Sequence, residues 1–386
     1  MNSIQGNIFN FTQEQLELRE QARRFSQSEI LPKAAYYDET SEFPEEIIRK
    51  AWELGFCNIV QDSSLGGSGL STLEACLVLE EIAAACSGFA TSIFGNDLGL
   101  TPINLFGTAE QKERLIGGLI KRKGFTSFCL SEPGAGSDAA GLTSALTKTD
   151  KGYLLNGVKQ WITNGGVADQ YTVFATLDKS LRHKGICCVV VSAKAPGVSC
   201  GPHEKKLGQR ASNTVQITFN NVEVPKENLI GGEGEGFKIA MRALDCSRPL
   251  TAIFSVGIAR AAYEYALAYS KERKQFGQPI SQFQAIQFML ADMITNIEAA
   301  RLLTWQSAKM LDAGLKSTLA SSMAKRFAAD MAMQVALDAV QIYGGYGYTK
   351  DYPVEKLMRD AKLIQIYEGT SQIQRVVIAK EILKDS

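Results

Sequence analysis

Histidine is nearly absent from this 386-residue chain, which contains only His183 and His203. With so few imidazoles, neither a histidine-based metal site nor a Ser-His-Asp triad is expected. We therefore predict no bound metal.

Net charge is also absent, because 41 lysines and arginines balance 41 aspartates and glutamates. A neutral chain has no overall field with which to hold nucleic acid or an anionic membrane surface. We predict neither partner, and an anionic ligand would have to be held by local groups.

The eight cysteines form no Cys-x-x-Cys pair and lie in apolar segments, so we expect reduced core thiols. No apolar run is expected to span a membrane. The opening stretch "MNSIQGNIFNFTQEQLELRE" lacks an apolar core segment and any early arginine. It predicts neither a signal peptide nor an intact transit peptide.

What is present is ordinary globular material, 45% hydrophobic and 21% charged, in three zones. Helical periodicity fills residues 1–125, where Thr12 is expected to cap the first helix. Short β-branched and aromatic runs broken by Gly, Asn and Pro fill residues 126–235. Helical patterns return over residues 236–386. The predicted fold class is therefore α+β, with an N-terminal all-α domain, a middle β domain and a C-terminal helical bundle.

Two apolar stripes in the last zone have the spacing of bundle-core positions. One stripe comprises Ile286, Met289, Met293 and Ile297, and the other Leu319, Met323, Phe327, Met331 and Val335.

Two stretches of the middle zone are not explained by packing alone. "FCLSEPGAGSDAAG" is a glycine-rich loop that could offer backbone N–H groups to a ligand, yet it has no P-loop or dinucleotide fingerprint. By itself it is equally a turn. "KQWITNGG" places Trp161 and Thr163 together, as an aromatic wall beside a hydroxyl or as a strand end in the core.

Three more stretches lie in the C-terminal zone. "ERKQFGQP" could form an anion clamp at Arg273 or simply a basic helix C-terminus. The glycine pair of "QIYGGYG" could end a helix or admit a ligand. "IQIYEGTSQIQR" sets Glu368 and Gly369 between two helical segments. The simplest interpretation is that Thr370 or Ser371 caps the last helix and that Glu368 is solvated.

In order and spacing, these stretches resemble the acyl-CoA dehydrogenase family over essentially the whole chain. The matching segments are "LSEPGAGSD", "WITNGG", "ERKQFG", "QIYGGYGY", "YPVEKLMRDAK" and "IYEGTSQIQR". "AWELGF" and "FGNDLG" make the sequence most similar to the medium-chain subgroup. The resemblance implies a helical domain, a β-barrel or sandwich and a four-helix bundle. It also implies FAD and the oxidation of a short- or medium-chain fatty acyl-CoA to trans-2-enoyl-CoA in β-oxidation.

The resemblance assigns roles to individual residues. It implies that Glu368 removes the α proton while flavin N5 accepts the β hydride. The residues implied to hold FAD are Phe128, Leu130, Ser131, Trp161, Thr163, Thr370 and Gln372, together with Arg273, Phe276, Gln341 and Gly345 from a neighbouring subunit. Those implied to contact the acyl-CoA are Ser137, Asp245, Arg248, Phe94, Tyr367 and Gly369.

The chemistry fits a buried carboxylate, because an α C–H is weakly acidic and its removal needs a base in contact with that carbon. The implied donors to the carbonyl oxygen are the backbone N–H of Glu368 and a ribityl hydroxyl. We expect burial to raise the pKa of Glu368 with no cation needed nearby. Ser247 occupies the position where some family members carry the base, and it cannot serve as one.

The resemblance also implies partners. One is an electron-transfer flavoprotein, which would dock on an apolar patch of this chain that includes Leu70 and carries Ser68 in place of an expected Leu. The other is further copies of this chain, in a homotetramer built from dimers. The expected compartment is the mitochondrial matrix or the bacterial cytoplasm. Phe94 stands where the medium-chain pattern has Glu, and chains of about four to ten carbons are expected. The alternatives are a branched-chain or other short-chain dehydrogenase, an acyl-CoA oxidase, and a non-catalytic assembly factor.

Overall fold

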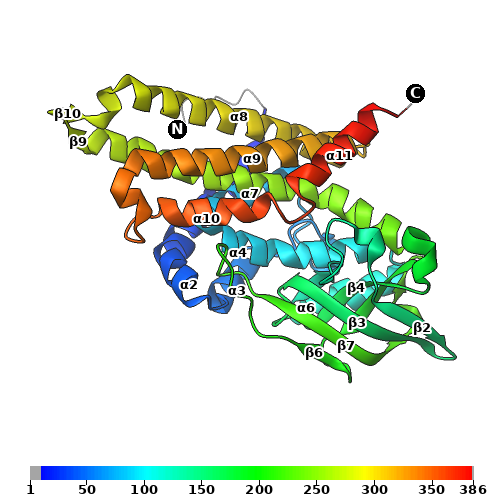
Figure 1. The fold of residues 1–386 in the computed structure, drawn as a ribbon. Coiled ribbons are helices and arrows are strands. Elements are labelled where there is room, and N and C mark those ends of the chain that lie inside the picture. Colours follow the sequence, from blue (N-terminus) through cyan, green and yellow to red (C-terminus); the bar gives the residue numbers. More distant parts are fainter. Residues whose placement is uncertain (1–9, 385–386) are drawn as a thin grey trace.

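The computed structural model describes residues 10–384. It has an N-terminal helical part, a middle β part and a C-terminal helical part, so the predicted order of the zones is confirmed. Figure 1 shows the long C-terminal helices lying across the N-terminal ones, with the strands gathered beside them. The outermost residues of the first and last predicted zones, 1–9 and 385–386, lie outside the described residues.

The N-terminal part begins at a capped helix, as predicted. The Thr12 hydroxyl accepts a hydrogen bond from the Gln15 backbone N–H at 3.2 Å, and the Gln15 side chain bonds back to the Thr12 N–H. The helices are α1 (Gln13–Phe25), α2 (Ala34–Thr40), α3 (Glu45–Glu53), α4 (Thr72–Phe106), α5 (Ala109–Lys112) and α6 (Gly118–Lys121), with short turns η1 (Ser26–Ile30), η2 (Leu31–Lys33), η3 (Ser63–Leu65) and η4 (Glu113–Gly117).

Helix α4 corrects one expectation from the sequence. It runs on through a kink at Cys86 (φ −163°, ψ 113°), and by length and composition alone it could cross a membrane. The expectation that no run reaches such a length was therefore wrong. In the structure 89% of its apolar window is buried inside the protein. The helix is apolar on nearly every side because it is surrounded by other elements of the chain.

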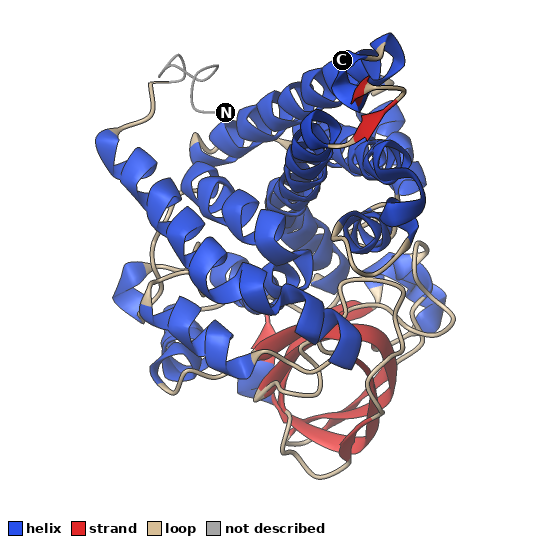
Figure 2. Cartoon of the chain, turned by 90° about the vertical axis from the view of Figure 1, so that its left-hand side faces the viewer, coloured by secondary structure: helices blue, strands red, loops and turns tan. Residues whose placement is uncertain are grey.

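The middle part is a curved sheet with strand order β6-β7-β3-β2-β4-β5-β8, and β1 pairs in parallel with β4. Figure 2 shows the strands gathered at one end of the molecule. The strands are β1 (Thr126–Cys129), β2 (Ala145–Thr149), β3 (Gly152–Thr163), β4 (Gln170–Thr176), β5 (Ile186–Ser192), β6 (Val198–Cys200), β7 (Thr214–Pro225) and β8 (Leu229–Ile230), with turns η5 (Ala139–Gly141), η6 (Lys179–Lys184) and η7 (Lys226–Asn228). The antiparallel register sets Thr163 opposite Thr214. The end of β3 lies beside α4, where the Asn164 side chain donates to the Ser92 carbonyl at 2.8 Å.

The C-terminal part is built on three long helices. They are α7 (Gly236–Glu272), α8 (Gln284–Asp312) and α9 (Thr318–Tyr343), followed by α10 (Val354–Ile364) and α11 (Ser371–Ile382), with hairpin strands β9 (Lys274–Gln275) and β10 (Gln278–Pro279) and turns η8 (Ile280–Gln282) and η9 (Gly344–Tyr348).

The burial of the two predicted apolar stripes agrees with the structure to different extents. Met293 and Ile297 of α8 are buried as predicted. On α9, Met331 and Val335 are buried, but Met323 is 38% exposed. The buried side of the first turns of α9 consists of small residues and one lysine: Ser321, Ser322, Ala324, Lys325, Ala328 and Ala329. Small side chains let neighbouring helices approach closely, so hydrophobic size alone placed Met323 wrongly in the first turns of this helix, whereas Met331 and Val335 further along are buried as predicted.

The cysteines are unpaired, as predicted. All eight lie among the described residues and are free thiols. Six are buried, whereas Cys200 is exposed and Cys246 half-buried, so these two are not fully core thiols.

A buried ionic cluster joins the helical parts. Arg301 of α8 pairs with Glu80 at 2.9 Å, and Arg260 of α7 pairs with Glu81 at 2.7 Å. Burial alone would raise the pKa of Glu80, but the positive charges of Arg301 and Arg260 lower it to about 2. The folded state therefore depends on an ionised Glu80.

We expect Glu80→Gln to destabilise the protein at pH 7 by about 3–5 kcal/mol, because it takes the buried carboxylate from both Arg301 and Arg260 and leaves Arg301 only Glu298 as an ion-pair partner. The loss is read as a lower thermal midpoint. Since the folded pKa of Glu80 lies below the unfolded one, its contribution is complete above about pH 5 and is lost as the pH falls toward 2. The gap between variant and wild type should close over that range. Glu53→Gln, which breaks only a surface pair, should match the wild type throughout. Equal midpoints for Glu80→Gln and wild type at pH 7 would contradict this.

Candidate active site

One cavity of about 320 Å³ collects most of the predicted site residues. Its wall comes from α4, from the β1 and β3 ends of the sheet, from α7 and from the segment between α10 and α11. The predicted residues that line it are Phe94, Phe128, Leu130, Ser131, Ser137, Trp161, Thr163, Arg248, Tyr367, Glu368 and Gly369. Residues far apart in sequence and from all three parts of the fold thus share one chamber.

Glu368 occupies a strained turn at this cavity. Glu368 and Gly369 follow each other at φ 57° and 83°, both in the left-handed region. Glycine adopts this conformation freely, whereas a glutamate there costs of order 1–3 kcal/mol. Thr370 caps α11 by accepting the Ile373 N–H at 3.1 Å, so the capping interpretation is correct for Thr370. It is wrong for Glu368, whose side chain faces the cavity and is not a solvated loop residue.

The electrostatics of Glu368 agree with the expected direction of its pKa and add two cations near the carboxyl. Burial raises the pKa of the Glu368 carboxyl, as predicted. Ser247 donates a hydrogen bond to Glu368 Oε2 at 2.5 Å, and the charges of Arg248 and Lys325 also oppose the rise. The rise thus needs no cation, as expected, and the two cations that lie near the carboxyl act against it. The two cations belong to α7 and α9, which the fold packs around the turn, and nothing local in the sequence reports that.

Arg248 is held from its own helix. It forms an ion pair with Asp245, whose other oxygen accepts the Thr318 hydroxyl at 2.8 Å. Arg248 lines the cavity and its Nε is buried without a partner. Ser137 is exposed on the glycine-rich loop at the cavity mouth. Arg248 and Ser137 are thus both available to a ligand entering there, while Asp245 serves chiefly to hold Arg248.

Another part of the cavity wall is suited to a flat ring. Trp161 is 61% exposed with φ 62°, so its indole leaves one side open. The hydroxyl-bearing side chains of Ser131 and Thr163 line the same cavity. An open aromatic side with nearby donors fits a planar heteroaromatic group that needs both stacking and hydrogen bonds.

A buried ion pair fixes this wall. Lys159 Nζ lies 2.8 Å from Glu132 Oε1 and also donates to the Leu130 carbonyl at 3.1 Å. Burial alone would raise the pKa of Glu132, but the charge of Lys159 lowers it to about 2. Glu132 accepts the backbone N–H groups of Thr143 and Ser144 as well. The glycine-rich loop is thereby tied to the sheet.

The inner end of the cavity is aromatic and tightly held. Phe94 is 6% exposed and meets Phe254 edge to face at 5.6 Å. Beside it, Thr91 donates to the Gln209 side-chain carbonyl at 2.7 Å. Burial raises the pKa of the neighbouring Tyr367 hydroxyl, which Thr91 and Gln209 partly counter. The end of the cavity therefore combines the phenyl ring of Phe94 with a polar corner formed by Thr91, Gln209 and Tyr367.

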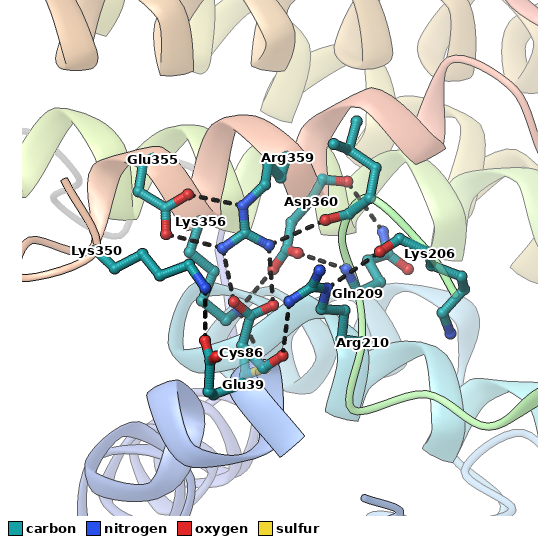
Figure 3. A network of polar contacts seen from close by, with 12 residues as sticks. Glu39, Cys86, Lys206, Gln209, Arg210, Lys350, Glu355, Lys356, Arg359 and Asp360 are labelled. Atoms are coloured by element: carbon teal, nitrogen blue, oxygen red, sulfur yellow. Dashed lines mark hydrogen bonds and ion pairs between the residues drawn. The ribbon is translucent and has the colours of Figure 1, made fainter. Parts of the chain in front are cut away.

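That corner is anchored to a buried network centred on Asp360 of α10. Asp360 accepts the Gln209 N–H at 2.5 Å, the Ser87 hydroxyl at 2.9 Å and the Lys356 ammonium at 2.6 Å. Figure 3 shows Asp360 and its neighbours on α10 facing Gln209 and Arg210 of the middle part. Helix α4, the middle part and α10 are thus locked together next to the cavity.

The remaining predicted residues lie elsewhere. Arg273 and Gly345 line a second cavity of about 570 Å³, where the Arg273 guanidinium lies 5.5 Å from the Tyr346 ring centre. Phe276, on the hairpin between β9 and β10, is 94% exposed at φ 51°. Gln341 at the end of α9 and Gln372 on α11 are exposed.

The two cavities are too far apart to form one site within a chain. Lys325 of α9 contacts the Gly369 carbonyl of the first site, whereas Tyr343, at the end of the same helix, lines the second. At about 1.5 Å per residue, the stretch between them spans roughly 27 Å. Figure 1 shows the β9–β10 hairpin at one end of the long helices, well away from α11.

Sequence reasoning missed Ser247 as a partner of Glu368, and it missed Lys325, Lys159 and Gln209 altogether. One signal was available. In "SSMAKRFAAD" the helix carries Lys325 close to several small residues. A lysine on an exposed side of a helix usually has polar neighbours, so the small ones indicate a buried lysine.

Comparisons with known proteins agree with this geometry. Three family profiles match: "Acyl-CoA dehydrogenase, N-terminal domain" over residues 12–123, "middle domain" over 127–222 and "C-terminal domain" over 234–383. The chain is 42% identical over 377 residues to "Acyl-CoA dehydrogenase, short-chain specific" of Clostridium acetobutylicum, covering 97% of this chain and all of that protein.

Two solved structures are similar over nearly the whole chain. Butyryl-CoA dehydrogenase from Megasphaera elsdenii has a TM-score of 0.94 and 41% identity, covering 97% of this chain and 99% of that one. A chain in a structure described as the electron transferring flavoprotein of Acidaminococcus fermentans has a TM-score of 0.95 and 44% identity, covering 98% of this chain and 100% of that one.

Proposed function

The chain belongs to the acyl-CoA dehydrogenase family. We propose that it uses FAD to dehydrogenate short-chain acyl-CoA and that Glu368 is the base. The observation that carries this proposal is a half-buried carboxylate in a left-handed turn, facing a cavity whose wall also includes an open indole. The product is the trans-2-enoyl-CoA.

The chemistry of the chain itself is proton removal. Glu368 takes the α proton of the thioester, and its raised pKa matches a base to a weak carbon acid. The backbone N–H of Glu368 stabilises the negative charge that grows on the carbonyl oxygen. Ser247 and Arg248 hold the carboxylate and its surroundings.

FAD is the cofactor, and the residues present fit it. Trp161 offers the open aromatic side, while Ser131 and Thr163 offer hydroxyls beside it. When bound, FAD supplies the acceptor for the hydrogen and electron pair that leave the β carbon. Phe128, Leu130, Thr370 and Gln372 are proposed to complete this contact.

Short chains are supported from two directions. The named relatives are a short-chain-specific enzyme and a butyryl-CoA dehydrogenase. In the cavity, Phe94 closes the inner end with a ring that is 6% exposed and set against Phe254. We therefore favour butyryl-CoA over the medium-chain substrates expected from the sequence. An anaerobic flavin-reduction assay across straight acyl-CoAs of increasing length tests this, and a maximum at eight carbons would contradict it.

Phe94→Ala should shift the preference to longer chains. Removing the ring makes room for about two further methylenes at ~0.8 kcal/mol each, or about a 15-fold gain in kcat/KM for hexanoyl-CoA relative to butyryl-CoA. Phe89→Ala is the matched control, because Phe89 is a fully buried phenyl on the same helix that packs on Tyr37 outside the cavity. It should lower stability without changing the length profile. An unshifted profile for Phe94→Ala would remove Phe94 from the acyl site.

We further propose an electron-transfer flavoprotein as the acceptor and a homotetramer as the assembly. The likeness to a chain in the Acidaminococcus fermentans flavoprotein structure supports the first, and the pair of separated half-sites supports the second. The similarity to bacterial proteins supports a bacterial cytoplasmic location over the mitochondrial one.

Leu70, half-buried before α4, is the proposed docking contact. Leu70→Arg should slow turnover with the flavoprotein by about 10-fold or more, as expected for a charge placed in an apolar contact. Reduction of the enzyme's own flavin by substrate should stay normal. Leu105→Arg, at a 39% exposed leucine away from that patch, should change neither rate. Unchanged flavoprotein-coupled turnover in Leu70→Arg would show that docking occurs elsewhere.

A further inference from the structure

Lys325 is an unusual lysine. It lies on α9 with 0% of its surface exposed, among small residues, and its ammonium donates to the Gly369 carbonyl at 2.7 Å. Within residues 10–384 it forms no ion pair with a carboxylate. Burying an ammonium group without an ion-pair partner is unfavourable, so a role in folding alone is a weak explanation for this residue.

The carbonyl that Lys325 holds belongs to the strained turn. Gln374 of α11 donates to the carbonyls of Glu368 and Gly369 at 3.0 and 3.1 Å, and Lys325 approaches the Gly369 carbonyl from α9. Two successive left-handed residues persist only when their surroundings fix them. The turn is therefore clamped from two helices, and Lys325 is the clamp that carries charge.

We propose that Lys325 is a positioning residue for the base, holding the Gly369 carbonyl so that the Glu368 carboxylate meets the substrate α carbon, while its charge favours the ionised carboxylate. The proposal rests on the proposed role of Glu368 and adds the group that orients it. Lys325 touches neither the substrate nor FAD in this account.

The charges around Lys325 and Glu368 define how the rate of flavin reduction depends on pH. Glu368 faces Arg248 of α7 and Lys325 of α9, with the Tyr367 hydroxyl alongside, and Lys325 also faces Asp330 of its own helix. Burial lowers the pKa of Lys325 to about 7, an effect that Glu368 and Asp330 oppose and Arg248 adds to. A charged Lys325 lowers the pKa of Glu368. Removing that charge must therefore move the acid limb of the rate profile to higher pH.

Two variants separate the hydrogen bond from the charge. Lys325→Met removes both, and should lower the flavin-reduction rate about 100-fold, as expected for a misplaced reacting group, with the acid limb shifted to higher pH. Lys325→Gln keeps an N–H donor without the charge, and should recover most of the rate while retaining the shifted limb. Lys316→Met, at an exposed lysine paired with Glu381, should behave as the wild type. Flavin absorbance and thermal midpoint check that each variant is loaded and folded.

A double-variant comparison tests whether Lys325 acts through Glu368. In a Glu368→Gln background, Lys325→Met should cause no further loss of flavin reduction, because the group it positions is already inactive. A full additional 100-fold loss would overturn the proposal, and so would an unshifted acid limb in both Lys325 variants. If Lys325→Met does not fold, Lys325→Gln takes its place in both comparisons. If Glu368→Gln alone reduces flavin at the wild-type rate, the proposed function fails, a result distinct from either outcome for Lys325.

Discussion

Glu368→Gln is expected to lower the rate of flavin reduction by butyryl-CoA by about 100- to 10,000-fold, the loss typical of removing a positioned general base. The amide keeps the size of the side chain, and the residue keeps its backbone N–H for the carbonyl oxygen. It removes only the proton acceptor. FAD content and acyl-CoA binding should therefore survive, while anaerobic stopped-flow mixing shows almost no bleaching of the flavin.

The pH profile gives an independent signature of the same group. Because burial raises the pKa of Glu368, the wild-type reduction rate should climb with pH through a range above that of an ordinary glutamate. That limb should vanish in Glu368→Gln. Glu264→Gln, at a 47% exposed glutamate on α7, should leave both rate and profile unchanged. If the flavin of the Gln variant bleaches at nearly the wild-type rate, Glu368 is not the base and only forms part of the turn that leads into α11.

Arg273→Glu should abolish activity for a different reason. Arg273 lies in the second cavity, away from Glu368, and is proposed to hold the FAD diphosphate of a neighbouring subunit. Reversing the charge replaces an attractive contact with phosphate by a repulsive one, so the purified variant should lose most of its flavin absorbance. Lys350→Glu, at an exposed lysine paired with Glu39, is the charge-reversal control and should keep its flavin.

The two inactive variants together test the shared site. If each site takes Glu368 from one chain and Arg273 from its neighbour, a dimer of one Glu368→Gln chain and one Arg273→Glu chain contains one fully intact site. Random co-assembly of the two variants should then restore about a quarter of the wild-type sites, as the symmetry of a dimer requires. Co-expressing the variants and assaying flavin reduction measures this. Activity no higher than the mean of the separate variants would place both residues in the site of a single chain.

The sequence by itself determined the order of the parts and the local ends of elements. Thr12 capped α1 as expected, because a capping box needs only residues three apart. The strands around Trp161 and Thr163 followed from β-branched runs broken by turn residues. Glu368 and Gly369 stood out because a carboxylate and a glycine interrupt two helical patterns. Each of these signals is carried by residues close in sequence.

Which side of a long helix faces inward was decided only by the tertiary structure. On α9 the larger apolar residues predicted Met323 in the core, whereas small residues and Lys325 are buried there and Met323 is 38% exposed. Helix α4 contains an apolar run long enough to cross a membrane, against expectation, and it can be apolar on nearly every side because other elements enclose it.

The environment of the proposed base was also decided by the tertiary structure. Ser247, Arg248 and Lys325 reach Glu368 from α7 and α9, and no local pattern around Glu368 indicates cations beside it. The Asp360 network joins α4, the middle part and α10 in the same way. Local patterns determine which residue can act as a base. How strongly that residue holds its proton depends on burial and on charges brought close by folding, because electrostatic interactions follow distance in space and not separation along the chain.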